Sequence, residues 1–282
     1  MRKRLLITDV DNTLFDWQEL WYQSFSAMID TIIAISGVER SVLLAECSVV
    51  HQRHGTSEYS YLIEELPCLA KLYNGDIISH MQPAIDAFRQ ARRLHLKLYP
   101  DVLATLKELR ERGVTIAAFT ESKAFYTNYR FRKLELDGPV GFLYSPSDHD
   151  LPVANVNAIR HYPLNSYKLK YTSHRHTADG EVKPNPHLLS TIVEELGFVK
   201  PEVVYLGDSA LKDVFMAQSA NVLDVHAAYG VAQRRPEYEL LRAVTHWTPE
   251  MVEREKHELS RRTILPSVSL NRGFAEITHF FE

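Results

Sequence analysis

Short apolar runs alternate with amphipathic segments along most of the chain. The runs that are typical of buried strands lie at 4–10, 114–120, 141–145, 203–208 and 222–230. Apolar residues recur at helical spacing in the segments between them, at 101–113, 124–134, 185–197 and 210–221. Strands that alternate with helices predict an α/β fold built on a doubly wound parallel sheet. Ligands of such sheets bind beyond the carboxyl ends of the strands.

Two stretches interrupt this alternation. Residues 16–98 contain helical periodicity but no strand pattern, which predicts a helical domain inserted into an α/β domain of residues 1–15 and 99–282. Residues 146–181 are rich in proline, asparagine, histidine and tyrosine and are expected to form a long loop. The pair His174 and His176 has no further ligands at metal-binding spacing, which favours a loop over a zinc site.

Composition places the chain among ordinary globular proteins. Its 282 residues are 45% hydrophobic and 24% charged, and a net charge of -4 gives no sign of a nucleic-acid-binding surface. No apolar run approaches the roughly 18 residues that a membrane-spanning helix needs. The two cysteines, Cys47 and Cys68, lie far apart without metal-ligand spacing, so a reducing, cytoplasmic location is expected. The sequence does not indicate an oligomeric state, nor the role of the charged segment 236–262.

Polar side chains that suit phosphate chemistry follow the predicted strands. Asp9 and Asp11 follow the first strand, Thr120 ends the second, Asp208 ends the run at 203–208, and Lys183 precedes a helix. One carboxylate can attack phosphorus while another protonates the leaving oxygen. A hydroxyl and an ammonium group can hold the phosphoryl oxygens, and further carboxylates can bind Mg²⁺. The set therefore predicts phosphoryl transfer.

These residues lie in four segments that resemble, in order, the four motifs of the haloacid dehalogenase (HAD) superfamily. The segments are "DVDNT", "FTES", "KPNP" and "GDSALKD". The resemblance extends from Arg4 to Gly230, and "RGFAEITHFF" near the end resembles the closing segment of the family. It implies a HAD Rossmann-like core, with 16–98 as an inserted α-helical cap of the C1 type.

The resemblance implies roles for single residues in the first three motifs. Asp9 would be the nucleophile that forms an aspartyl-phosphate. Asp11 would act as general acid and then as the base that activates water. Thr13 would brace the turn, and Thr120 and Lys183 would neutralise the phosphoryl oxygens.

The same resemblance implies a magnesium site. Its ligands would be the Asp9 side chain, the Asp11 backbone carbonyl and Asp208. Asp213 would either join through water or orient Lys183. Mg²⁺ is thus the expected cofactor.

Asp11 also narrows the expected reaction. Relatives that cleave carbon–halogen or carbon–phosphorus bonds lack an aspartate at this position, so hydrolysis of a small phosphorylated metabolite, a phosphomonoester, is favoured. A phosphomutase of the same superfamily and a non-enzymatic phosphoacceptor or phosphate-binding protein stay open as alternatives. A receiver domain would be much shorter, and a glycosyltransferase would need a nucleotide-binding unit before Asp9.

Further residues are candidates for substrate binding. In the α/β domain these are Thr13, Glu121 and Ser122. Glu121 and Lys212 both depart from the residues that are common in the family. In the helical insertion, "HQRHGTSEY" could present His51, Arg53 and His54 to the substrate, or these could be ordinary polar residues of a helix end. The aromatic residues Trp17, Trp21, Tyr22 and Phe25 recur at helical spacing, which indicates packing.

Overall fold

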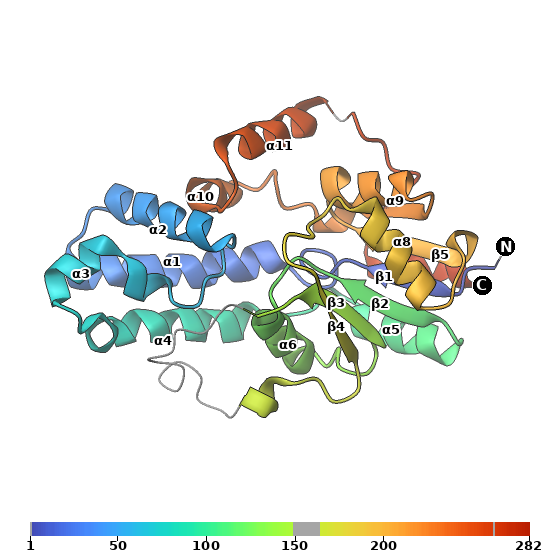
Figure 1. Cartoon of the computed structure of the whole chain (residues 1–282), viewed down its shortest axis with the longest axis horizontal. Helices are drawn as coiled ribbons and strands as arrows, with labels where there is room; N and C mark the ends of the chain where they lie inside the picture. Colours follow the sequence, from blue (N-terminus) through green and yellow to red (C-terminus); the bar gives the residue numbers. More distant parts are fainter. Residues whose placement is uncertain (1, 149–163, 262) are drawn as a thin grey trace. The chain divides into compact units, whose positions relative to one another are not determined.

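The computed structural model describes residues 2–148, 164–261 and 263–282, and the chain divides into two compact units (Figure 1). The α/β unit comprises residues 1–16, 97–231 and 264–282. The helical unit comprises residues 17–96 and 232–263.

A seven-stranded sheet, in which every pair of neighbours is parallel, forms the centre of the α/β unit. The strand order is β4-β3-β2-β1-β5-β6-β7. The strands are β1 (Leu5–Thr8), β2 (Thr115–Phe119), β3 (Phe142–Pro146), β4 (Ser173–Thr177), β5 (Val203–Gly207), β6 (Leu223–Ala227) and β7 (Val268–Leu270). All four residues of β1 are buried, as expected for a parallel strand with neighbours on both sides, where no polar face is required. The predicted α/β fold with a doubly wound parallel sheet is confirmed.

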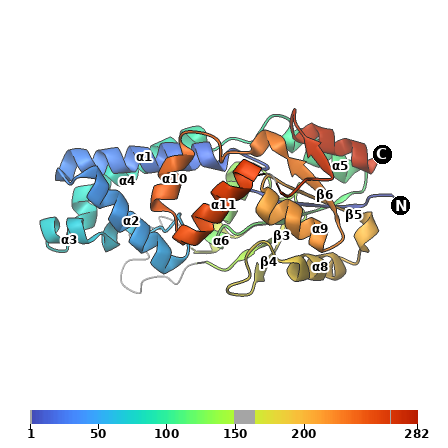
Figure 2. The same ribbon diagram turned by 90° about the horizontal axis from the view of Figure 1, so that it is seen from above.

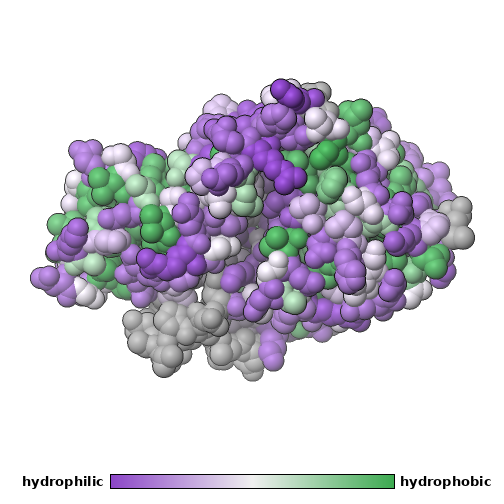
Figure 3. Space-filling view, turned by 45° about the horizontal axis from the view of Figure 1, so that its top comes forward, coloured by the Kyte–Doolittle hydropathy of each residue, from purple (hydrophilic) through white to green (hydrophobic). Residues whose placement is uncertain are grey.

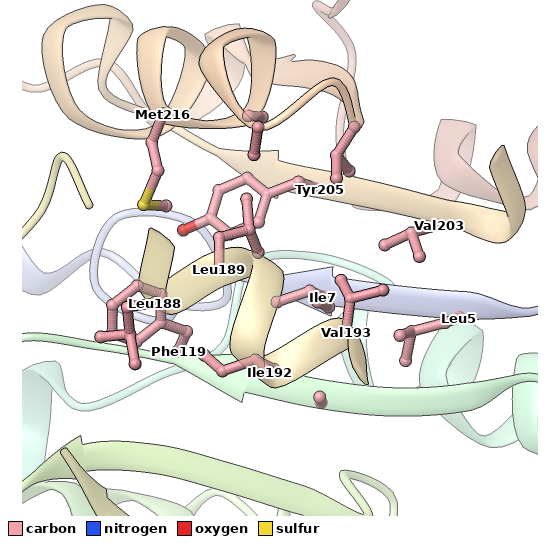
Figure 4. Close-up of a cluster of buried hydrophobic side chains, with 14 of the residues drawn as sticks. Leu5, Ile7, Phe119, Leu188, Leu189, Ile192, Val193, Val203, Tyr205 and Met216 are labelled. Atoms are coloured by element: carbon pink, nitrogen blue, oxygen red, sulfur yellow. The ribbon is translucent and has the colours of Figure 1, made fainter. Parts of the chain in front are cut away.

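Helices alternate with the strands of this unit. They are α5 (Val102–Glu111), α6 (Ala124–Lys133), α8 (Pro186–Glu195), a π-helix (Ala210–Val214), α9 (Phe215–Ser219) and 3₁₀ helices at Leu164–Tyr167, Lys200–Glu202, Ala228–Gly230 and Phe274–Phe281. α8 and α9 cover one face of the sheet, with α5 on the other side (Figure 2). The core under α8 joins Ile7, Phe119 and Tyr205 of three adjacent strands to Leu189 and Met216 (Figure 4). This packing fixes the strand ends that bear the polar residues.

The edge strand β4 was not predicted by the sequence pattern. Residues 173–177 fall in the expected loop, but they pair in parallel with β3. Their sequence, Ser-His-Arg-His-Thr, has no apolar alternation, because an edge strand can leave its side chains partly exposed. His174 accordingly lies in a strand, where its Nε2 is 2.7 Å from Ser145 Oγ. Residues 149–163 of the same expected loop lie outside the described residues.

The helical unit has two chain segments. The first contains α1 (Trp17–Ser36), α2 (Arg40–His54), a 3₁₀ helix (Leu62–Glu65), α3 (Pro67–Tyr73) and α4 (Ile77–His95), and the second contains α10 (Tyr238–Val244) and α11 (Pro249–Arg261). α1 runs along α4 (Figures 1 and 2). The rings of Trp17, Trp21 and Phe25 stack in sequence along α1, which agrees with a packing role.

Residues 232–263 belong to the helical unit, whereas the sequence analysis placed them in the α/β domain. Contacts with α2 and the turn after it explain the difference. His51 Nδ1 donates a hydrogen bond of 2.6 Å to the Val244 carbonyl, and Ser57 Oγ is 3.0 Å from His246 Nδ1. Trp21 Nε1 in turn donates to the Ser57 carbonyl at 3.0 Å. Such long-range hydrogen bonds leave no periodic signal in the sequence.

Within the described residues, no helix is long and apolar enough to cross a membrane. Hydrophilic side chains cover much of the face shown in Figure 3, with smaller hydrophobic patches between them.

The buried histidine of α2 makes the stability of the helical unit depend on pH. His51 is 1% exposed, and burial lowers its pKa to about 4. The unfolded chain binds this proton already near pH 6.5, so the stabilisation from neutral His51 is complete above that pH and is lost as pH falls toward 4. We expect the free energy of unfolding to fall by up to about 3 kcal/mol over this window through His51 alone.

Urea unfolding of the wild type and of His51→Asn between pH 4 and 7 measures this contribution. Asparagine retains a donor for the Val244 carbonyl but does not titrate, so the variant should show a flatter dependence on pH. His80→Asn in α4, where the histidine is exposed, is the control and should behave as the wild type. An identical pH dependence in His51→Asn and the wild type would contradict the prediction.

Candidate active site

Three adjacent strands place polar residues at one edge of the sheet, the edge formed by the carboxyl ends of the strands. β1 lies between β2 and β5, and all three run in the same direction. Asp9 and Asp11 follow β1, Thr120 follows β2, and Asp208 follows β5. The carboxyl ends of parallel strands meet at one edge, which brings side chains from distant parts of the sequence together.

A buried lysine lies at the centre of this edge. Lys183 Nζ donates to Asp9 Oδ1 at 2.5 Å and to Asp213 Oδ1 at 2.9 Å. Asp213 also accepts hydrogen bonds from Tyr205 OH at 2.8 Å and from the Ser209 amide at 3.1 Å. Asp213 is thereby held in position to orient Lys183, which favours one of the two roles that the sequence left open for it.

Burial changes the acid–base properties of these groups. Desolvation raises the pKa of Asp9 to about 7, against the opposing effect of Lys183 and with a further contribution from Asp213. Desolvation also raises the pKa of Asp208 well above its usual value, and the charge of Asp9 adds to this effect. For Lys183, desolvation acts to lower the pKa, but Asp213 and Asp9 outweigh it and hold the pKa well above its usual value. Lys183 therefore stays protonated, and the surplus negative charge lies on the aspartates.

The same carboxylates form a group that could hold a metal ion. Asp9, Asp208 and Asp213 are all buried, and each offers an oxygen atom within 4.8 Å of the others. Hard divalent cations such as Mg²⁺ and Ca²⁺ prefer carboxylate oxygens as ligands. A divalent cation would also offset the repulsion between the carboxylates, so the donor set fits such an ion.

Asp11 has a separate set of partners. Its Oδ2 accepts hydrogen bonds from Thr120 Oγ1 at 3.1 Å and from Ser122 Oγ at 2.6 Å. Asp9, in contrast, accepts through Oδ2 from Thr13 Oγ1 at 3.0 Å. The two carboxylates, one residue apart, are thus oriented by different side chains and are free to perform different tasks.

The two residues that depart from the family pattern pair with each other. Lys212 Nζ contacts Glu121 Oε2, and Glu121 Oε1 accepts the Lys183 amide at 2.9 Å. The π-helix positions this lysine, since the Val214 amide donates to the Ser209 carbonyl five residues earlier at 3.1 Å. The Glu121 carboxylate is therefore neutralised by a lysine where it could otherwise repel an anion.

The candidates of the helical unit all have partners within that unit. His51 binds the Val244 carbonyl, while Arg53 and His54 both contact Glu65, at 3.0 Å and 2.9 Å. The role of these residues in substrate binding stays a prediction.

Sequence reasoning missed two residues of this edge. Arg130 contacts Asp11, but a basic residue in the last turn of a helix has an ordinary explanation in the helix dipole. Tyr205 lies in an apolar strand, where a tyrosine is common. A buried phenol needs a hydrogen-bond partner, which is the one signal that could have pointed to Tyr205.

Carboxylates and a buried lysine at the carboxyl ends of parallel strands lie where α/β proteins bind their ligands. A model of the haloacid dehalogenase-like hydrolases matches residues 3–221, and the chain belongs to this family. The resemblance inferred from the four motifs is thereby confirmed.

Individual relatives share less than a quarter of their residues with this chain at aligned positions. The chain is 24% identical over 234 residues to the glyceraldehyde 3-phosphate phosphatase of Methanopyrus kandleri, which covers 82% of this chain and 86% of the relative. Among solved structures, the HAD-hydrolase YfnB of Bacillus subtilis has a TM-score of 0.51 at 14% identity, covering 100% of both chains. A 2-haloacid dehalogenase of Pseudomonas syringae has a TM-score of 0.51 at 16% identity, covering 99% of this chain and 98% of that one. At these identities the structural likeness shows the fold alone.

The buried carboxylates lead to a prediction for metal binding. We expect Mg²⁺ at about 100 times its dissociation constant to stabilise the α/β unit by about 2.7 kcal/mol. The reason is that the ion binds the clustered carboxylates of the folded protein but not the separated carboxylates of the unfolded chain. Asp208→Asn should abolish most of this effect. The measurement is the thermal unfolding midpoint with Mg²⁺ and with a chelator.

Asp224→Asn is the matched control, because Asp224 is another buried aspartate of the α/β unit but binds Ser267 instead. This variant should keep the full shift caused by Mg²⁺. A shift that survives in Asp208→Asn would place the metal elsewhere.

Proposed function

We propose that the protein is a Mg²⁺-dependent phosphatase that hydrolyses a small phosphomonoester through an aspartyl-phosphate intermediate. The observation that carries the proposal is the division of partners between Asp9 and Asp11. Asp9 lies against Lys183 in the buried cluster, and Asp11 is held by Thr120 and Ser122. A nucleophile and a separately oriented proton carrier are what hydrolysis in two steps requires.

In the first step, a carboxylate oxygen of Asp9 attacks phosphorus as the bond from phosphorus to the ester oxygen breaks. The carboxylic proton of Asp11 passes to that oxygen, and the alcohol leaves. Lys183 offsets negative charge beside Asp9 as charge accumulates on the phosphoryl oxygens. The Thr120 hydroxyl, which donates to Asp11 in this structure, would turn to a phosphoryl oxygen when the substrate binds.

In the second step, water attacks the phosphorus of the aspartyl-phosphate. Asp11, now a carboxylate, takes a proton from the water, and the bond between phosphorus and the Asp9 oxygen breaks. Inorganic phosphate leaves, and both aspartates return to their starting states. Asp11 thus gives and receives one proton per cycle.

The metal would be held by Asp9, Asp208 and the backbone carbonyl of Asp11, with Asp213 orienting Lys183. When bound, Mg²⁺ supplies positive charge that stabilises the phosphoryl oxygens and keeps the Asp9 carboxylate ionised. The desolvated cluster of carboxylates supports this assignment.

The substrate class also finds support in the comparisons. The Methanopyrus kandleri relative is named a glyceraldehyde 3-phosphate phosphatase. Its name supports a small phosphorylated metabolite as substrate and favours hydrolysis over the phosphomutase alternative. The cap residues Arg53 and His54 are proposed to contribute to recognition of the rest of the substrate, and His51, which is buried against Val244, to hold their helix.

We expect Asp9→Asn to abolish phosphate release, because an amide nitrogen or oxygen cannot serve as the nucleophile. Release of phosphate from a panel of phosphorylated metabolites, with and without Mg²⁺, measures the effect, and circular dichroism checks that the variant is folded. Asp224→Asn, away from the cluster, should remain active. Full activity of Asp9→Asn would refute the intermediate, and transfer of phosphate to a second sugar position by the wild type would favour a phosphomutase.

The pair formed by Glu121 and Lys212 predicts a second effect. Lys212→Met leaves the Glu121 carboxylate unneutralised beside the phosphate-binding edge and should raise KM for the ester by roughly tenfold through like-charge repulsion. The double variant Glu121→Gln with Lys212→Met removes both charges and should recover most of the loss. Steady-state kinetics of both single variants and the double variant test this, and a double variant as impaired as Lys212→Met would show that charge is not the cause.

A further inference from the structure

Arg130 of α6 is a buried arginine in contact with the proposed proton carrier. The residue is 2% exposed. Its guanidinium NH1 lies 3.3 Å from Asp11 Oδ1 and 3.2 Å from Ser122 Oγ. Burying a guanidinium group is costly unless it is paired, and Asp11 supplies the opposite charge.

Aromatic rings hold the guanidinium group in place. Arg130 Cζ lies 5.5 Å from the ring centroid of Phe15 and 5.6 Å from that of Tyr126. Phe15 pairs with Asp11 through a β-bridge, so this ring belongs to the same loop as Asp11. A planar arginine fork between rings is more restricted than a lysine would be.

Arg130 is the third side-chain donor to the Asp11 carboxylate, besides Thr120 and Ser122. Oδ2 accepts from Thr120 and Ser122, and Oδ1 faces Arg130. Both carboxylate oxygens are therefore engaged by partners other than the Lys183 cluster that holds Asp9. A displacement of about 1 Å of a reacting group can cost roughly 100-fold in rate, so this restraint bears directly on proton transfer.

We propose that Arg130 is a positioning residue that holds the Asp11 carboxyl group where it exchanges a proton with the leaving oxygen. The inference rests on the proposed function, since it assigns a role within that reaction. Arg130 acts through Asp11 by fixing its geometry, and Ser122 links the two as a shared hydrogen-bond partner. The alternative is that Arg130 only fills the space between Phe15 and Tyr126.

The leaving group distinguishes these roles. An alkyl phosphate needs a proton on its departing oxygen, whereas a nitrophenyl phosphate leaves as a stable phenolate and needs little help from an acid. Loss of correct Asp11 positioning should therefore slow the alkyl ester selectively. A packing defect should slow both esters together.

The experiment measures kcat and KM of the full chain with both esters for three variants. Arg130→Met keeps much of the apolar stem but removes the charged fork, and Arg130→Lys keeps the charge. Arg132→Met is the matched control, because Arg132 lies in the same helix and is exposed. For Arg130→Met we expect kcat to fall by about tenfold or more with the alkyl ester and by less than about threefold with the nitrophenyl ester.

Arg130→Lys should recover part of the loss with the alkyl ester, and Arg132→Met should match the wild type. If Arg130→Met does not fold, Ser122→Ala, which removes a hydrogen bond to Asp11 of 2.6 Å, should show the same selectivity for the alkyl ester. Equal losses with both esters in these variants, or a rise in KM alone, would overturn the inference.

The wild type and Asp9→Asn are assayed in parallel. If the wild type hydrolyses both esters through Asp9 but the selectivity for leaving groups is absent, the positioning role fails and the phosphatase assignment stands. If hydrolysis by the wild type does not depend on Asp9, the proposed function fails and the role of Arg130 falls with it.

Discussion

The carboxylates at the carboxyl ends of the strands depend on one interaction, the bridge that the Lys183 ammonium group forms between Asp9 and Asp213. Three buried carboxylates within 4.8 Å of one another would repel strongly in a medium from which water is largely excluded. Lys183 bridges Asp9 and Asp213 and stays charged despite its burial. A single positive charge cannot balance three ionised carboxylates. The site therefore suits a further cation.

The second feature of the edge is that neighbouring carboxylates are kept apart in function by different partners. Asp9 shares its environment with the buried lysine, and Asp11 shares its own with hydroxyl groups and an arginine. Lys183 precedes α8 and Arg130 lies in α6, and the fold around β1, β2 and β5 brings them to aspartates that follow β1. The fold thus assigns separate environments to residues that the sequence places almost side by side.

Local signals in the sequence were sufficient for the sheet centre and for the placement of Asp9, Asp11, Thr120 and Asp208 after its strands. Buried parallel strands are apolar throughout, so β1, β2 and β5 are easily recognised, and the polar residues after them follow from the strand ends. The polar edge strand β4 has no such signal. The ion pair of Glu121 with Lys212 and the contact of Arg130 with Asp11 join residues about 90 and 120 positions apart, and no periodicity can reveal such pairs.

The helical unit is assembled from segments that lie far apart in the chain. Residues 17–96 form most of it, but α10 and α11 follow strands β2 to β6 in the sequence. During synthesis, which proceeds from the N-terminus, α2 therefore emerges long before the Val244 carbonyl that His51 binds. The surface of α2 that contacts this carbonyl therefore stays uncovered until residue 244 has left the ribosome. Completion of the helical unit thus follows the synthesis of strands β1 to β6, although residues 17–96 are made before five of these strands.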